Sequence, residues 1–481
     1  MFDRLCLIIG DQRRDETVTG QGEDVLNPAT EEVLGRVPHA RGEDLDDVIQ
    51  AAVSGFAAWR LSPPEQRRRV LHAAADLVRD RIDELARVMT LEQGKTVTEA
   101  LGEWERVADT LVWNGDAAME PPATHYPPRS SELEQFTWHE PVGVCLALTA
   151  WNFPAILPVR KLAPALAAGC SVILKAAEET PASAMALVDI LLESGLPPGA
   201  VNLVFGDPAK VASKLIASSV VRKVTFTGSV RVGKLLAAQA AEDLKRCTLE
   251  LGGHGPALVF DDADVESAAR TLAAFKFRNA GQVCIAPSRF YIHEAVYDAF
   301  KAHFVEHARQ VVVGSGIDPK TTMGPMANRR RVNAMARLKS NALQGGASLV
   351  FEGKTVPETG YFVAPMVLEN LHPDAAVLKE EPFGPIAPLV RFSEEQDAVI
   401  VANSLPYGLA AYLFTGSADR ARRVAAAVES GSVAINTVSP AQPETPFGGV
   451  KDSGYGYEGG REGIESFMVK KLVSAPTGFL D

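Results

Sequence analysis

Three residues that lie far apart in the sequence could together carry out acyl chemistry. Cys284 lies in Phe277-Arg-Asn-Ala-Gly-Gln-Val-Cys284, where we expect a helix to break at Gly281 and leave the thiol in a turn. Glu250 ends one apolar run, and Asn152 follows another. A thiol can attack a carbonyl, an amide can donate to the oxyanion that forms, and a carboxylate of raised pKa can activate water.

Each of these residues also has an ordinary structural interpretation. A free cysteine is usually buried and inert, a carboxylate at a strand end usually forms an ion pair, and asparagine is common in turns. Among the histidines, only His254 lies in one of the motifs, so a cysteine-histidine hydrolase is not supported.

The elements that would position these residues have the pattern of a doubly wound α/β sheet. Short apolar runs at 142–150, 171–174, 201–205 and 224–226 alternate with segments of helical length, which is typical of parallel strands buried on both faces. Ligands bind such sheets beyond the carboxyl ends of the strands, where Trp151-Asn152, Lys175, Thr227-Gly228 and Glu250 are expected. After residue 255 the alternation resumes, which predicts a second α/β unit that carries Cys284.

Two amphipathic helices are expected in the N-terminal third. Apolar residues recur at helical spacing over 43–60, and Ser62-Pro63-Pro64-Glu65 predicts a second helix that starts at Pro63 with Ser62 as its cap.

Size and composition indicate a globular protein with two or three domains, since 481 residues with 46% hydrophobic content can bury a large core. The net charge of −12 argues against a nucleic-acid partner. The apolar run from Leu5 to Ile9 is too short for a signal-peptide core, so we expect a cytoplasmic protein that does not associate with a membrane. The five cysteines contain no C-x-x-C pair, so neither a disulfide framework nor a metal site is expected, and the four besides Cys284 should be buried and inert.

Two segments could bind a nucleotide. Phe226-Thr-Gly228-Ser229, with Gly233 five residues after the first glycine, resembles a dinucleotide loop, although an ordinary strand-to-helix turn would look the same. Lys175 and Glu178 could hydrogen-bond ribose hydroxyls. Because Glu178 would repel a 2′-phosphate, we expect NAD to be preferred, with NADP as the alternative cofactor.

Seven motifs together resemble the NAD(P)-dependent aldehyde dehydrogenase superfamily in order and spacing over nearly the whole chain. They are Trp151-Asn-Phe-Pro154, Lys175-x-x-Glu178, Phe226-Thr-Gly-Ser229, Glu250-Leu-Gly-Gly253, Gly281-Gln-x-Cys284, Glu381-Pro-Phe-Gly-Pro385 and Pro446-Phe-Gly-Gly-Val-Lys451.

The resemblance implies an α/β fold with three parts. These are a Rossmann-like NAD-binding domain formed by 1–121 and 142–252, an α/β catalytic domain at 253–450, and a small β oligomerisation arm formed by 122–141 and 465–481. Family members are dimers or tetramers, so a homo-oligomer is expected.

The resemblance also implies residue roles. Cys284 would attack the aldehyde, the Asn152 side chain and the Cys284 backbone N–H would hold the oxyanion, and Glu250 would activate water for thioester hydrolysis. The cofactor would contact Trp151, Lys175, Glu178, Gly228, Ser229, Val232, Leu251, Glu381 and Phe383.

Closer features resemble succinate-semialdehyde dehydrogenases and their α-ketoglutaric-semialdehyde branch. Arg160 and Arg278 match two arginines that bind a substrate carboxylate in that group, although they could instead be a surface charge and a structural cation. Ile156 and Leu157 stand where the α-ketoglutaric branch carries polar residues, which favours a longer aliphatic or an aromatic aldehyde. The alternatives are therefore a broad-specificity aldehyde dehydrogenase and, more remotely, a non-catalytic structural protein on this fold.

Overall fold

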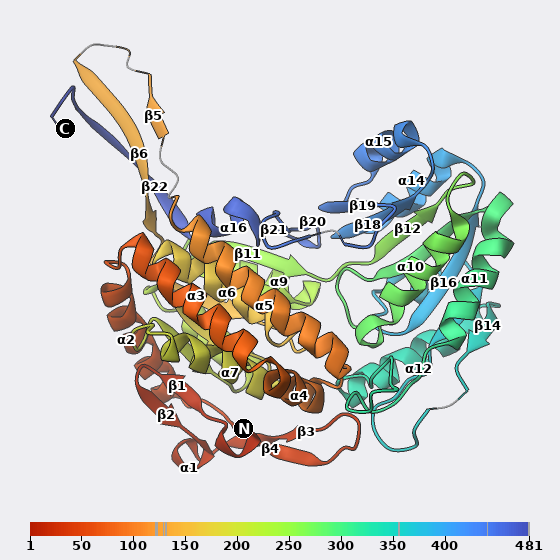
Figure 1. Ribbon diagram of the computed structural model, residues 1–481, viewed down its shortest axis with the longest axis horizontal. Coiled ribbons are helices and arrows are strands. Elements are labelled where there is room, and N and C mark those ends of the chain that lie inside the picture. Colours follow the sequence, from red (N-terminus) through yellow and green to blue (C-terminus); the bar gives the residue numbers. More distant parts are fainter. Residues whose placement is uncertain (121–123, 128, 130–131, 355, 440, 480–481) are drawn as a thin grey trace.

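The structure is a computed structural model that describes residues 1–481 except 121–123, 128, 130–131, 355, 440 and 480–481. Figure 1 shows two α/β units beside each other, with a long strand arm that projects away from the first unit. Positions 122–123, 128, 130–131 and 480–481 belong to the expected oligomerisation arm and lie outside the described residues.

The first sheet holds most of the predicted nucleotide-binding elements. Its strand order is β2 (Gln12–Arg14), β1 (Leu7–Ile9), β9 (Val201–Val204), β8 (Ser171–Lys175), β7 (Val144–Leu148), β10 (Val221–Gly228), β11 (Arg246–Leu251) and β21 (Gly454–Tyr455). β9, β8, β7, β10 and β11 run parallel to one another. Every residue of β7 and β8 is buried, as expected for strands covered on both faces.

Helices enclose this sheet and contribute to one hydrophobic core. They are α2 (Gly42–Trp59), α3 (Pro64–Asp80), α4 (Ile82–Gln93), α5 (Val97–Ala117), α6 (Ile156–Ala168), α7 (Pro181–Glu193), α8 (Pro208–Ile216), α9 (Val230–Glu242) and α16 (Gly460–Glu465). The N-terminal segment adds η1 (Phe2–Arg4), α1 (Glu16–Thr19) and the hairpin of β3 (Gly22–Leu26) and β4 (Val33–Pro38).

The second sheet forms the core of the other unit. Its strand order is β14 (Ser348–Glu352), β15 (Met366–Glu369), β16 (Ile386–Phe392), β13 (Pro287–His293), β12 (Gly255–Val259), β18 (Ala410–Phe414) and β19 (Ser432–Ile435). Its helices are α10 (Val265–Phe277), η2 (Arg278–Gly281), η3 (Glu294–Val296), α11 (Tyr297–Arg309), α12 (Arg329–Gln344), α13 (Ala376–Lys379), α14 (Glu395–Asn403) and α15 (Ala418–Ala427). β17 (Tyr407–Gly408) pairs with β20 (Val450–Lys451).

The projecting arm pairs β22 (Met468–Pro476) with β6 (Leu133–Pro141), which in turn pairs with β5 (Thr124–Tyr126). At the base of the arm, Phe467 and Met468 are buried in the core of the first unit. Farther along β22, Leu472 is 60% exposed.

The structure confirms the predicted α/β class, with parallel strands and two α/β units. The start of the second helix was predicted one residue early. Pro63 has extended backbone (φ −66°, ψ 155°) and α3 begins at Pro64, because a residue that precedes proline avoids the helical region. No side-chain cap forms there, so the predicted role of Ser62 is wrong.

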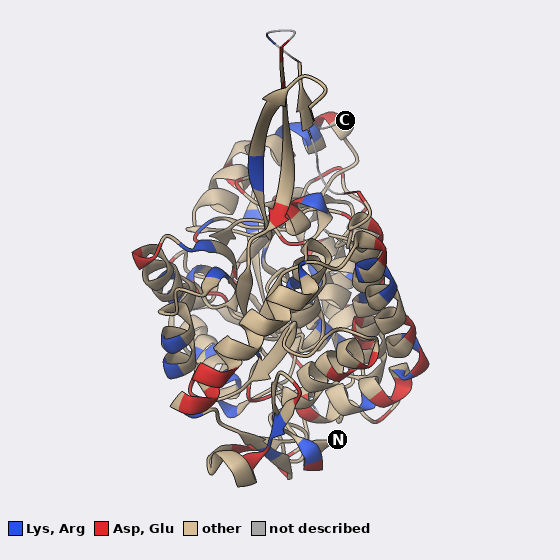
Figure 2. Ribbon diagram, turned by 90° about the vertical axis from the view of Figure 1, so that its left-hand side faces the viewer, with Lys and Arg blue, Asp and Glu red and all other residues tan. Residues whose placement is uncertain are grey.

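Among the described residues, no helix is both long enough and apolar enough to cross a lipid bilayer. Figure 2 shows acidic and basic residues interspersed over the face that carries the arm.

Candidate active site

The parallel register of the first sheet brings the predicted nucleotide-binding residues to one edge. Lys175, at the end of β8, is paired with Leu148 at the end of β7. β10 and β11 end together, with Thr227 opposite Glu250 and Gly228 opposite Leu251. Strand ends that were far apart in the sequence therefore lie side by side at the carboxyl edge, where α/β sheets bind ligands.

The turn after β10 has the form of an anion-binding helix start. Ser229 is the N-cap of α9, and its hydroxyl accepts a hydrogen bond from the Val232 N–H at 3.4 Å. A β-carbon on Gly233 would lie 2.4 Å from the Leu251 side chain, so the glycine permits α9 to approach β11 closely. The free N–H groups of the first turn of α9 could bind a pyrophosphate.

Lys175 and Glu178 form a buried ion pair just beyond β8, with 2.6 Å between the Lys175 Nζ and a Glu178 oxygen. The other Glu178 oxygen accepts from the Gly206 N–H at 2.8 Å. The carboxylate is therefore fixed at the strand end, where it could accept hydrogen bonds from ribose hydroxyls.

Glu381 is a second buried carboxylate near this edge. It accepts a 3.3 Å hydrogen bond from the Gly253 N–H, and burial raises its pKa to about 7. Lys276 acts on Glu381 electrostatically and is itself fully buried, which lowers the Lys276 pKa to about 7. Its Nζ has no hydrogen-bond partner among the described residues, and no sequence pattern predicted this buried cation.

Two predicted cofactor-binding aromatics meet beside Glu381. The Trp151 and Phe383 rings are arranged edge to face with centroids 5.6 Å apart. Phe383 has a left-handed backbone (φ 46°), and the Arg331 guanidinium donates to the carbonyls of Pro382 and Phe383. Together with Glu381, these rings could hold the ribose and nicotinamide of a dinucleotide.

The turn that carries Cys284 differs from the prediction. α10 ends at Phe277, four residues before the expected break at Gly281. Arg278 is extended (φ −56°, ψ 136°), whereas Asn279 and Ala280 take left-handed φ values of 49° and 51°. Arg278 is therefore the residue after the helix and does not share a helix with Cys284. Left-handed backbone costs roughly 1–2 kcal/mol per non-glycine residue, so surrounding contacts must stabilise this turn.

Those contacts come from Asn279, which the sequence analysis did not single out. Its side-chain oxygen accepts from Gln93 at 3.0 Å, and its side-chain nitrogen donates to the Asn152 carbonyl at 2.9 Å. Its backbone N–H donates to Glu99 at 2.7 Å. These distant partners replace the helical hydrogen bonds that the sequence pattern predicted.

Asn152 is oriented from both sides. Its side-chain nitrogen donates to the Gln282 carbonyl at 3.1 Å, which ties the amide to the turn before Cys284. Its own carbonyl accepts from Lys95 at 3.0 Å, and Lys95 forms a buried ion pair with Glu103. A side-chain amide has two N–H donors, so the second can point toward a bound carbonyl oxygen.

The thiol of Cys284 lies within electrostatic range of other predicted site residues. Although the residue is partly exposed, the protein packed around it raises the pKa of the thiol to about 12. Glu381 and Glu250 contribute to this raised pKa, whereas Arg160 opposes it. The structure thus brings Cys284, Glu250, Glu381 and Arg160 into one site.

Glu250 is 3% exposed, and neither carboxylate oxygen has a hydrogen-bond partner among the described residues. Burial raises its pKa well above the usual range, and the nearby Glu458 carboxylate adds to the effect. Glu458 forms a buried ion pair with Lys161, whose charge opposes the shift. The sequence analysis did not predict this pair. Lys161 lies among the apolar residues of α6, and this position could have indicated a buried cation that needs a carboxylate partner.

His254 has a structural role. Its ring nitrogens contact the Ser288 hydroxyl at 2.7 Å and the Val377 carbonyl at 3.2 Å, and burial lowers its pKa. Cys6, Cys145 and Cys170 are buried as expected, but Cys247 is partly exposed, which corrects the prediction for that residue.

The two predicted substrate arginines lie against aromatic rings. The guanidinium carbon of Arg160 is 5.0 Å from the centre of the Phe447 ring, and that of Arg278 is 5.7 Å from the centre of the Phe153 ring. Neither arginine forms an ion pair with any residue that the structure describes. Phe447 belongs to a small apolar cluster against which Cys284 packs, so Arg160 lies one side chain away from the thiol.

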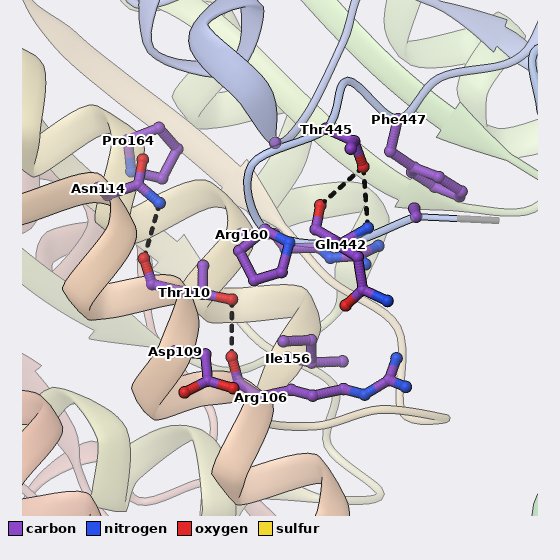
Figure 3. A pocket seen from close by; sticks show the side chains of 13 residues that line it. Arg106, Asp109, Thr110, Asn114, Ile156, Arg160, Pro164, Gln442, Thr445 and Phe447 are labelled. Carbon is purple, nitrogen blue, oxygen red and sulfur yellow. Dashed lines mark hydrogen bonds between the residues drawn. The ribbon is translucent and has the colours of Figure 1, made fainter. Parts of the chain in front are cut away.

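A pocket opens beside Arg160 between α5, α6 and the segment before β20 (Figure 3). Its lining includes Arg160, Ile156 and Phe447, together with Arg106 from α5. Cys284, Arg278 and the predicted cofactor residues do not line it. Arg106 was missed because a charged residue at helical spacing normally indicates a solvated face.

Comparisons with known proteins agree with this geometry. The model of the aldehyde dehydrogenase family matches residues 16–473. A putative 4-(hydroxymethyl)benzenesulfonate dehydrogenase from Comamonas testosteroni is 46% identical over 93% of this chain and 94% of its own. The NADP(+) succinate-semialdehyde dehydrogenase of Escherichia coli is 39% identical over 98% of both chains. The crystal structure of a Burkholderia pseudomallei succinate-semialdehyde dehydrogenase superposes with a TM-score of 0.96 at 40% identity, over 98% of both chains. The chain therefore belongs to the aldehyde dehydrogenase family, whose enzymes oxidise aldehydes with NAD(P).

Proposed function

We propose that the enzyme oxidises an aldehyde that bears an anionic group, such as succinic semialdehyde, to the corresponding acid. The observation that carries this proposal is the position of Arg160. Its guanidinium stacks on Phe447, next to Cys284, without a carboxylate partner among the described residues. A planar guanidinium binds a carboxylate through two parallel hydrogen bonds, which would orient the aldehyde end of the substrate toward the thiol.

In the proposed mechanism, the thiolate of Cys284 attacks the aldehyde carbon and forms a thiohemiacetal. The Asn152 amide and the Cys284 backbone N–H donate to the oxyanion, a contribution of about 3 kcal/mol in comparable sites. When bound, the nicotinamide accepts the hydride that leaves the substrate carbon. Glu250 then takes a proton from water as the water attacks the thioester, the carbon–sulfur bond breaks, and the acid leaves. A carboxylate with a raised pKa and free oxygens suits this role.

NAD is the proposed preferred cofactor, with NADP as the alternative. The described residues fit a dinucleotide, because Ser229 caps an accessible helix start, and Lys175 and Glu178 lie at an adjacent strand end. We assign Trp151, Gly228, Val232, Leu251, Glu381 and Phe383 to the same cofactor site. Glu178 would repel a 2′-phosphate, so Glu178→Ser should raise kcat/KM for NADP relative to NAD by at least about tenfold. An equal efficiency with both cofactors in the wild type would contradict the preference.

A second candidate substrate is an aromatic aldehyde with an anionic substituent. The relative named for a benzenesulfonate shares 46% identity, and Ile156 and Phe447 give the pocket apolar walls that suit a ring. The test is a panel of succinic, glutaric and α-ketoglutaric semialdehydes, 4-sulfobenzaldehyde, benzaldehyde and hexanal, assayed with NAD and with NADP. Higher kcat/KM for neutral aldehydes than for all anionic ones would reject the proposed substrate class.

We also propose the domain division expected from the sequence, with 1–121 and 142–252 binding the cofactor, 253–450 carrying Cys284, and 122–141 with 465–481 forming the arm. A homo-oligomer, either dimer or tetramer, is proposed because the arm projects from the body and Leu472 on it is largely exposed. We place the enzyme in the cytoplasm. Light scattering coupled to size-exclusion chromatography tests the oligomer, and a monomeric mass would contradict it.

A further inference from the structure

Arg106 lies on the face of α5 that supports the catalytic turn. Glu99 on this face accepts from the backbone N–H of Asn279, and Glu103 accepts from the backbone N–H groups of Ala155 and Ile156. Arg106 follows Glu103 by three residues, so it lies one helical turn farther along the same face. It lines the pocket that also contains Arg160, and Figure 3 shows its side chain extending from α5 near Ile156.

Two guanidinium groups, those of Arg106 and Arg160, line this pocket, and Arg278 lies within electrostatic range of Arg106 although it does not line the pocket. Burial lowers the pKa of Arg106, and the charges of Arg278 and Arg160 lower it further. None of the three arginines forms an ion pair with another described residue. Asp109 also lines the pocket, but its carboxylate accepts from Arg79 at 3.0 Å. Asp109 offsets part of the repulsion on Arg106, and an anion bound between the arginines would relieve more of it.

The arginines differ in their exposure and in their effect on the thiol. Arg160 is partly buried and acts on the pKa of Cys284, whereas Arg106 lines the same pocket but keeps part of its side chain in contact with solvent. Apolar side chains line the pocket beside them, including Ile156 and Phe447. This arrangement provides one cation that acts on the thiol, an apolar wall, and a second, more exposed cation in the same pocket.

We propose that Arg106 is a specificity-determining residue that binds the anionic group of long, aromatic aldehydes, with the ring against Ile156 and Phe447. Short semialdehydes place their carboxylate on Arg160 and Arg278 and do not reach Arg106. This inference rests on the proposed function, because it assigns a further residue to the same anion-binding site. The group recognised is a sulfonate or carboxylate para to the aldehyde.

The test compares Arg106→Gln with the wild type on 4-sulfobenzaldehyde, 4-carboxybenzaldehyde, benzaldehyde and succinic semialdehyde. We expect kcat/KM for the two anionic benzaldehydes to fall about 10- to 100-fold, mainly through KM, because a charged hydrogen-bonding partner is lost. Benzaldehyde and succinic semialdehyde should change by less than about twofold. Arg106→Lys should restore part of the loss. Arg69→Gln, which removes an exposed positive charge on α3, is the matched control and should leave all four substrates unchanged.

Two results would overturn the proposal: unchanged kinetics with both anionic benzaldehydes, or an equal loss with all four substrates, which would indicate a structural role. Thermal unfolding of Arg106→Gln shows whether the fold is retained. If it is not, kcat/KM of the folded Arg106→Lys variant for the same four substrates is compared with the wild type instead. Arg278→Ala, assayed in parallel, separates the two proposals. Selective loss of anionic substrates in Arg278→Ala without any selective effect in Arg106→Gln would reject only the role of Arg106. A wild type that uses benzaldehyde as efficiently as every anionic aldehyde would reject both.

Discussion

Arg160 stacks on Phe447 with its guanidinium carbon 5.0 Å from the ring centre, and this contact fixes a positive charge beside the thiol of Cys284. The charge lowers the pKa of a thiol that burial and two carboxylates raise to about 12. Arg160 therefore has two effects in one place, since it favours the thiolate and offers a binding group to an anionic substrate.

Replacing Glu250 should separate the two half-reactions. Glu250→Gln removes the proposed base for water but leaves Cys284 and Asn152 unchanged. We expect a burst of one NADH per subunit to persist while steady turnover falls about 10²- to 10⁴-fold, the usual contribution of general-base catalysis. Rapid-mixing absorbance measurements check this, and either an absent burst or unchanged turnover would contradict the assignment.

The same substitution should not destabilise the protein. The pKa of Glu250 is higher in the folded protein than in the unfolded chain. Above the unfolded pKa the unfolded chain therefore releases this proton more readily, and the free energy of unfolding falls as the pH rises. A neutral glutamine removes this penalty. Urea unfolding at pH 8 should therefore give Glu250→Gln a free energy of unfolding equal to or above that of the wild type. A loss of more than about 1 kcal/mol would show that the carboxylate has a structural partner.

Alkylation of Cys284 should report on its charged neighbours. Because the thiol pKa is about 12, the rate of iodoacetamide alkylation without cofactor should increase with pH up to at least pH 10. Glu381→Gln removes a negative charge that raises this pKa, so alkylation at pH 8.5 should be faster. Arg160→Gln should make it slower. Mass spectrometry of the modified peptide measures the rates, and identical rates in all three proteins would contradict the electrostatic account.

The buried pair of Lys161 and Glu458 should affect both stability and pH dependence. Glu458→Gln leaves the buried Lys161 without its counter-charge, which we expect to cost about 3 kcal/mol of stability. The Glu458 carboxylate also raises the pKa of Glu250, so its loss should lower that pKa and move the acidic limb of the turnover profile to lower pH. Glu465→Gln, an exposed change on the adjacent α16, is the control. A shift of the limb to higher pH would contradict the assignment.

Much of the scaffold was predictable because its strands are buried on both faces. The apolar runs that became β7, β8, β9 and β10 are continuous, and parallel register then places Lys175 and Glu250 at one edge without further information. The resemblance to the family supplied Glu381 and Phe383, which no local pattern indicated.

The parts that could not be predicted depend on contacts between distant segments. The helix before Cys284 ends early because Asn279 bonds to Gln93 and Asn152, which are 186 and 127 residues away in the sequence. Lys161 and Glu458 are separated by 297 residues. From the sequence alone, Arg106 cannot be distinguished from other charged residues on a solvated helix face. Its place in the pocket depends on the packing of α6 and the segment before β20 against α5.

The most direct test of substrate recognition is the ratio of kcat/KM for succinic semialdehyde to that for hexanal, measured in the wild type and in Arg278→Ala. If the arginines bind the substrate carboxylate, the ratio should fall about 10- to 100-fold in the variant. Hexanal has no carboxylate for Arg278 to bind, so only the efficiency with the semialdehyde should decrease. An unchanged ratio would contradict the account and leave a broad-specificity aldehyde dehydrogenase in its place.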